Sequence, residues 1–209
     1  FLNSVTNFIK KRTFEFIGLI LISTSVALAI AFTTYSPEDP SFIYGDRDFE
    51  IKNFFGIYGS SVADFLLQSF GLVSFLILAN FLFWGINLII KKEIKRIILK
   101  LFLVVAYLVL GTIFIYITFN NSFWLIDNGN GGFVGKIGYE FLSTWFPYID
   151  NSYSAYGLLL LTLILFIFSS DLNFKKIATG TYSIIASLFR RRNNAVPDIN
   201  FDETPVEEK

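Results

Sequence analysis

The sequence lacks three residue types that carry much of protein chemistry. It has no Cys, which excludes a disulfide framework and any thiolate chemistry or thiolate metal site. It has no His, which removes the commonest general base and metal ligand. It has no Met and begins with Phe1, so we expect a processed form or a fragment. No net charge is present either, which argues against a globally basic nucleic-acid binder.

Charged residues are also scarce, and apolar residues take their place. Charged side chains make up 16% of the 209 residues, against about 25% in an average soluble domain. Hydrophobic residues reach 54%, with 26 Phe, and the mean hydropathy is +0.57. A globule of this size cannot bury so much apolar surface. The composition therefore argues against a soluble fold, and against disorder, which needs low hydrophobicity.

Four uncharged stretches are long enough to cross a bilayer, which takes about 20 helical residues. Their apolar residues run all the way round a helix, as lipid requires. We predict an all-α polytopic membrane protein with transmembrane helices at residues 15–34, 68–90, 98–119 and 152–170. The basic residues before the first stretch resemble a signal peptide. Its apolar run is too long and ends in Tyr35-Ser36-Pro37, so we interpret it as a retained helix.

The basic residues predict the orientation of these helices. They cluster before the first helix, between the second and third, and after the fourth; the clusters include Lys10, Lys11, Arg12, Lys91, Lys92, Arg190, Arg191 and Arg192. The other two connections hold only Arg47, Lys52 and Lys136. By the positive-inside rule, both termini are cytoplasmic and loops 35–64 and 120–150 lie outside. The clustered basic residues are then inner-leaflet anchors on the lipid bilayer.

The chain divides into three parts by composition. Residues 1–170 hold the four-helix transmembrane domain. Residues 171–192 have an apolar and a polar helical face but are too short to span, which predicts an amphipathic helix on the inner leaflet. Residues 193–209 are polar and acidic and read as the start of a disordered cytoplasmic linker.

Several features of the loops and spans have ordinary structural explanations. The acidic first outer loop does not have the spacing of a calcium-binding EF-hand loop, so we expect no metal site there. The glycine run at 128–135 has no following Lys-Ser/Thr, and we interpret it as a turn rather than a phosphate cradle. Within the spans, Ser25 and Asn80 are suited to hydrogen bonds between helices. No acid–base pair, nucleophile or cofactor motif is present, so we expect no enzyme activity.

The order of several short motifs resembles the N-terminal four-helix membrane domain of the FtsK/SpoIIIE family of bacterial DNA translocases. The most specific motif is the turn Tyr35, Ser36, Pro37, Glu38, Asp39, Pro40, Ser41 after the first helix. Further ones are Asn53-x-x-Gly56-x-x-Gly59, Trp84-Gly85, and Gly131, Gly132 and Gly135 before the last helix. The resemblance covers about residues 13–190.

The resemblance implies a membrane anchor at the division septum of the bacterial inner membrane. It implies contacts with other cell-division membrane proteins and, because the family's motor is a ring, a homo-oligomer. It also implies that DNA is engaged only through a motor domain, whose Walker A motif is not found in this sequence. The two outer motifs, 35–41 and 131–135, are the surfaces expected to meet partners, unless both are simply turns.

Two other classes of protein remain open from the sequence. Four spans are also compatible with a small transporter or channel subunit, although no mid-span charge or broken helix marks a transport path. A lipid-modifying membrane enzyme is disfavoured by the missing His and Cys.

Overall fold

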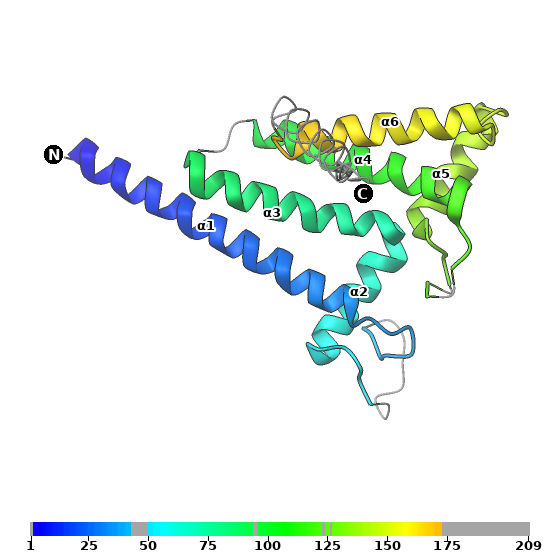
Figure 1. Cartoon of the computed structure of the whole chain (residues 1–209), viewed down its shortest axis with the longest axis horizontal. Coiled ribbons are helices and arrows are strands. Elements are labelled where there is room, and N and C mark those ends of the chain that lie inside the picture. Colours follow the sequence, from blue (N-terminus) through cyan, green and yellow to red (C-terminus); the bar gives the residue numbers. More distant parts are fainter. Residues whose placement is uncertain (1, 43–49, 94–95, 123, 126, 173–209) are drawn as a thin grey trace, which may run out of the picture. The chain divides into compact units, whose positions relative to one another are not determined.

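The computed structural model describes residues 2–42, 50–93, 96–122, 124–125 and 127–172, and every regular element in these ranges is helical. Figure 1 shows them in chain order. They are α1 (Leu2–Thr33), α2 (Gly56–Phe70), the short 3-10 helix η1 (Gly71–Val73), α3 (Ser74–Lys91), α4 (Ile97–Phe119), α5 (Gly132–Trp145) and α6 (Ser152–Ser169). Of the amphipathic helix predicted at 171–192, Asp171 and Leu172 are described and are not helical, and the remainder lies outside the described residues, as does the predicted linker at 193–209.

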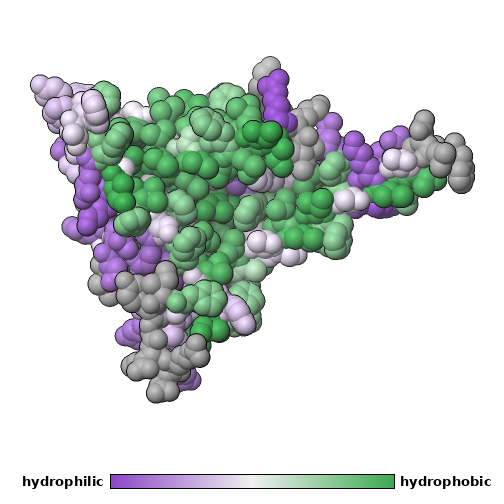
Figure 2. Space-filling view, turned by 180° about the vertical axis from the view of Figure 1, so that it is seen from behind, coloured by the Kyte–Doolittle hydropathy of each residue, from purple (hydrophilic) through white to green (hydrophobic). Residues whose placement is uncertain are grey.

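Four helical segments are long and apolar enough to cross a membrane: Val5–Thr33, Gly56–Lys91, Ile97–Phe119 and Ser152–Ser169. α4, with 23 residues, is about 34 Å long at 1.5 Å per residue, which exceeds a hydrocarbon core of about 30 Å. Figure 2 shows apolar side chains forming a broad continuous surface, with polar ones gathered toward its two sides. This surface matches what contact with lipid requires. The membrane fold predicted from composition is therefore confirmed.

The helices pack as two pairs. α1 lies along α3, and α4 lies along α6, with α5 also against α4. Gly18 of α1 and Gly85 of α3 bring the first pair together so closely that a Cβ on Gly18 would lie 2.7 Å from the Gly85 carbonyl oxygen. Such small residues allow close helix contact where lipid supplies no hydrophobic driving force.

We name the two ends of this bundle by their sequences. The basic end holds the start of α1, the connection between α3 and α4, and the end of α6. The loop end holds the described parts of the long connections 34–55 and 120–131, together with α2 and α5.

The second predicted helix, 68–90, is interrupted in the structure. α2 ends at Phe70, η1 turns the chain, and α3 begins at Ser74. Gly71 has φ +56°, and the Leu72 amide donates to the carbonyl of Asn130 at 2.9 Å instead of continuing the helix. The aromatic-rich piece before Phe70 is thus a separate helix at the loop end (Figure 1).

The predicted second outer loop, 120–150, contains a helix that the glycine pattern concealed. Turns do occur at 127–128 and 130–131, but α5 begins at Gly132. Gly135 lies so close to α4 that a Cβ there would be 2.6 Å from the Thr112 carbonyl oxygen, and Gly138 packs on Ile113. Glycine here serves helix packing, which a reading of glycine as a turn residue does not anticipate.

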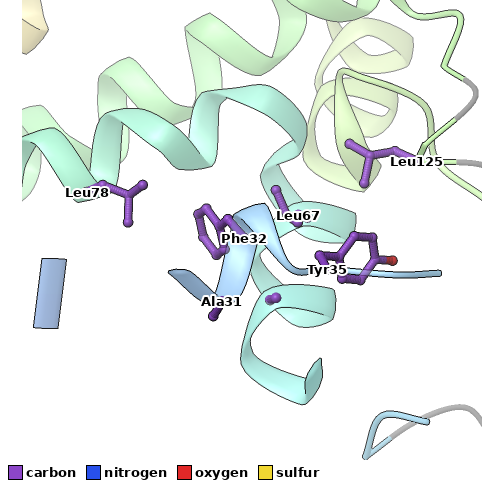
Figure 3. Packing of buried hydrophobic residues seen from close by; sticks show 7 residues of the cluster. Ala31, Phe32, Tyr35, Leu67, Leu78 and Leu125 are labelled. Carbon is purple, nitrogen blue, oxygen red and sulfur yellow. The ribbon is translucent and has the colours of Figure 1, made fainter. Parts of the chain in front are cut away.

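A small buried core closes the loop end, as Figure 3 shows. Ala31, Phe32 and Tyr35 at the end of α1 meet Leu67 of α2. The same cluster takes in Ala63, Leu78 of α3 and Leu125 from the second long connection. Phe32 packs edge-on against Phe75, with ring centroids 5.3 Å apart. This core holds in place the turn that follows α1.

Candidate functional site at the loop end

The turn at 35–41 is held against the protein by its buried residues, whereas Pro37 and Glu38 are exposed. The Asp39 amide donates to the carbonyl of Ser36 at 3.1 Å, which closes the turn around Pro37. Tyr35 and Asp39 are each only 7% exposed, and Pro40 is fully buried. The Ser60 hydroxyl of α2 donates to the Pro40 carbonyl at 2.5 Å. The motif therefore fixes the end of α1 against α2.

The carboxylate of Asp39 holds this turn in place through hydrogen bonds. It accepts the backbone amides of Lys52 at 2.9 Å and Asn53 at 2.8 Å. The Asn53 side chain in turn donates to the carbonyl of Ala31 at 2.9 Å. A charged acceptor makes stronger hydrogen bonds than a neutral one, above all when it is buried. Asp39 thus ties the entry of α2 to the exit of α1.

The neighbouring Glu38 forms an ion pair on the surface. Its carboxylate lies 2.5 Å from the ammonium of Lys52, and both side chains are mostly exposed. The hydrogen bond from Lys52 lowers the pKa of Glu38, and the same bond raises the pKa of Lys52. Solvent screening keeps the contribution of such a pair to stability small.

Tyr35 connects the turn to the second long connection. Its hydroxyl donates to Asp64 at 3.0 Å and accepts from Gln68 at 3.2 Å. Gln68 also accepts from the side chain of Asn128 at 2.9 Å, and the Trp124 indole donates to the Tyr35 carbonyl at 3.3 Å. Burial, with the nearby Asp64 charge as a lesser cause, raises the pKa of Tyr35 well above its usual value. Gln68 therefore bridges the two connections.

The second predicted motif, Gly131, Gly132 and Gly135, forms a backbone-to-backbone junction. A Cβ on Gly71 would lie 1.8 Å from the Asn130 carbonyl oxygen, and one on Gly132 would lie 2.6 Å from the Gly71 amide nitrogen. Gly131 presses on Tyr116 of α4, where a Cβ would come within 2.7 Å. Only glycine fits this contact between the break in the second span and the start of α5.

The structure thus places both predicted motifs at one end. We call these motifs and the residues that connect them the loop-end junction, which comprises residues 35–41, 53, 64, 68, 71, 124–125 and 128–135. Within these motifs, Tyr35, Asp39, Pro40 and the three glycines are buried in contacts within the chain, whereas Pro37 and Glu38 are exposed. Exposed apolar residues of the junction's surroundings include Phe42 at 72% and Tyr58 at 73%. The sequence offered no specific sign of Gln68 or Trp124, since neither belongs to a recognisable motif.

A second polar cluster ties α6 to the rest of the bundle near the basic end. The Asn80 side chain donates to the Tyr107 hydroxyl at 2.6 Å and accepts from Ser170 at 2.9 Å. It also exchanges hydrogen bonds with Ser169, whose carbonyl accepts the Trp84 indole at 2.8 Å. Asn80 and Ser25, which donates to the Leu78 carbonyl at 2.8 Å, do bond between helices as predicted.

Ion pairs mark the basic end. Lys100 is 9% exposed and pairs with Asp171 immediately after α6. Glu15 pairs with Arg12 at 2.6 Å, as its spacing predicts, and also with Lys92 at 2.5 Å. The predicted anchors Lys10, Lys11 and Lys91 are exposed there, while Arg190, Arg191 and Arg192 lie outside the described residues.

Among the described residues, no group of three or more acidic side chains is arranged to hold a metal ion. Asp46 and Asp48 of the acidic first connection lie outside those residues. At the described loop end, the carboxylates of Glu38, Asp39 and Asp64 form hydrogen bonds and an ion pair that hold the two long connections in place.

Comparison with known proteins gives one consistent result. Residues 10–181 match a family model described as the 4TM region of DNA translocase FtsK/SpoIIIE. No solved structure matches the chain.

Three relatives named DNA translocase FtsK illustrate the similarity. The protein of Rhizobium meliloti is 31% identical over 134 residues, which are 64% of this chain and 15% of the relative. That of Azospirillum brasilense is 31% identical over 90 residues, 43% of this chain and 14% of the relative. That of Rickettsia prowazekii is 37% identical over 70 residues, 34% of this chain and 9% of the relative.

The chain therefore spans only a small part of the length of the relatives it matches. The family model covers most of the chain, including three candidate spans in full and the first from residue 10 onward. On the strength of that match and of its helical membrane fold, this chain belongs to the FtsK/SpoIIIE family, as a four-transmembrane region of that family.

Proposed function

We propose that this chain anchors a bacterial DNA translocase in the inner membrane and directs it to the division septum. The observation that carries the proposal is the family match over residues 10–181. The fold supports it, because four apolar segments are held together by the loop-end junction and by the polar cluster around Asn80. Such a bundle is suited to act as a stable anchor in a bilayer. The distribution of basic residues supports cytoplasmic ends, by the positive-inside rule.

In this proposal the membrane domain itself would catalyse no reaction. The relatives are named as DNA translocases, and the movement of DNA would be carried out by a separate motor domain, as the family resemblance implies. The chain would contact the bilayer through its apolar helix surface. Other division proteins and further copies of the chain would meet it through exposed aromatic residues around the loop-end junction, such as Phe42 and Tyr58.

The test is localisation in dividing bacteria. We would fuse a fluorescent protein after Lys209 and compare the unchanged chain with Asp39→Ala, which breaks the loop-end junction, and Glu38→Ala, which removes only a surface pair. We expect a mid-cell band for the unchanged chain and Glu38→Ala, and a weakened band for Asp39→Ala at equal membrane content. Uniform membrane fluorescence of the unchanged chain would contradict septal targeting, and cytosolic fluorescence would contradict anchoring.

A further inference from the structure

A cleft opens at the basic end between the two helix pairs. Its volume is about 210 Å³, and its apolar wall is formed by Ile17 and Leu21 of α1, Leu88 of α3 and Ile97 of α4. For comparison, an apolar cavity of about 150 Å³ accommodates benzene. The cleft is partly open, so a longer chain can enter from one side.

The polar side chains of this cleft include charges of both signs. Lys100 and Asp171, which pair with one another, line it together with Glu93 and Asn87. Charges of both signs therefore adjoin an apolar slot. The ammonium of Lys100 has three donors, so it can serve a phosphate oxygen while it keeps its bond to Asp171.

We propose that this cleft binds one phospholipid with a zwitterionic, amine-bearing headgroup. One acyl chain fills the slot beside Leu21 and Leu88, the phosphate meets Lys100, and the headgroup ammonium faces the carboxylate of Asp171. A headgroup of this kind complements the paired charges of Lys100 and Asp171, whereas an anionic headgroup would bring no amine to the carboxylate of Asp171. The bound chain completes the seam between the α1–α3 pair and α4.

The surrounding surface supports a lipid as the occupant. Exposed residues on the three helices that form the cleft are large and apolar, among them Ile20, Ile90 and Leu101. The slot is thus continuous with the surface that the bilayer already covers. The proposal concerns the fold in its membrane and holds whether or not the chain reaches the septum.

Native mass spectrometry of the detergent-purified chain tests the proposal. Phosphatidylethanolamine and phosphatidylglycerol with identical acyl chains would be added in turn. We expect one retained phosphatidylethanolamine per chain, at about tenfold higher affinity than phosphatidylglycerol. Leu21→Phe, which fills the slot, should abolish that retention. Leu19→Phe, the same substitution at an exposed position of the same helix, should not.

A fluorescence measurement locates the lipid independently. Trp84 lines the cleft, whereas Trp124 and Trp145 lie toward the loop end. In a Trp124→Phe/Trp145→Phe chain, phosphatidylethanolamine with brominated acyl chains should quench Trp84 saturably, at one lipid per chain. Equal retention of both lipids would overturn the headgroup assignment. Quenching that never saturates, or a dimer whose formation Leu21→Phe blocks, would overturn the site.

Discussion

At the scale of single residues, Asp39 carries more of the loop-end junction than its charged neighbour does. It is buried and accepts two backbone amides, while Glu38 makes an exposed ion pair. We expect Asp39→Ala to lower the free energy of unfolding by about 2 to 4 kcal/mol, because two amides lose a charged acceptor. Unfolding in mixed micelles by added SDS measures this. Glu38→Ala is the control, and a loss equal to that of Asp39→Ala would contradict the assignment.

Tyr35 gives the junction a pH dependence at the alkaline side. Its pKa is raised above the usual value of 10.0 by burial, so the folded chain holds the phenol proton after the unfolded chain has released it. The stabilising effect is complete below about pH 10 and decreases as the pH rises further. We expect the free energy of unfolding to decline above about pH 10 more steeply in the unchanged chain than in Tyr35→Phe. Identical profiles in the same SDS assay would show that Tyr35 is not held protonated.

At the scale of elements, three glycines distinguish two reasons why a position requires glycine. One reason is a positive φ, and the other is a lack of space for a side chain. Gly71 needs both its positive φ and its lack of a side chain, Gly56 has φ +61° with nothing within 4 Å, and Gly157 in α6 has open space and helical backbone. We expect Gly71→Ala to cost about 2 to 5 kcal/mol of stability and Gly56→Ala about 1 to 2 kcal/mol. Gly157→Ala should be neutral or stabilise by up to about 1 kcal/mol.

The same unfolding assay ranks the three variants. The close backbone contact between Gly71 and Asn130 predicts that the loss of stability is largest for Gly71→Ala, smaller for Gly56→Ala and smallest for Gly157→Ala. If Gly71→Ala were no worse than Gly56→Ala, the close approach of the two connections would not exist in the protein.

The elements also show what sequence could and could not predict. Long apolar runs made the spans evident, and α4 begins at Ile97, one residue from its predicted start. The break at Gly71 depends on a hydrogen bond to Asn130, almost 60 residues away, and no local pattern carries that information. α5 was concealed because its glycines pack against α4, which local sequence does not distinguish from a turn.

For the loop-end junction and the Asn80 cluster, the sequence predicted positions in the chain but not tertiary contacts. The resemblance located the motif at 35–41, but its burial against Ser60 and its link through Gln68 to Asn128 are tertiary facts. Ser25 and Asn80 were found because polar groups within a span need partners. Their particular partners, such as Tyr107, follow only from the packing of the helix pairs.

At the scale of the whole molecule, Asn80 joins three helices. Its side chain bonds to Tyr107 of α4 and to Ser169 and Ser170 at the end of α6. Because each hydrogen bond within a membrane contributes roughly 0.6 kcal/mol on average, we expect Asn80→Leu to lower the stability by about 1 to 3 kcal/mol. Ile90→Leu, at an exposed position of the same helix, should leave it unchanged. An unchanged stability of Asn80→Leu in the SDS assay would contradict the role of this cluster.

The anchor account depends most directly on topology: four crossings that place the basic end in the cytoplasm. The chain has no Cys, so single cysteines can be introduced at Phe42 and Tyr148, both exposed at the loop end, and at Lys11 and Lys91 at the basic end. Spheroplasts would be labelled with a membrane-impermeant maleimide before and after permeabilisation. We predict immediate labelling at Phe42 and Tyr148, and labelling of Lys11 and Lys91 only after permeabilisation. Labelling of Phe42 and Tyr148 from opposite sides, or of Lys11 in intact spheroplasts, would contradict the account.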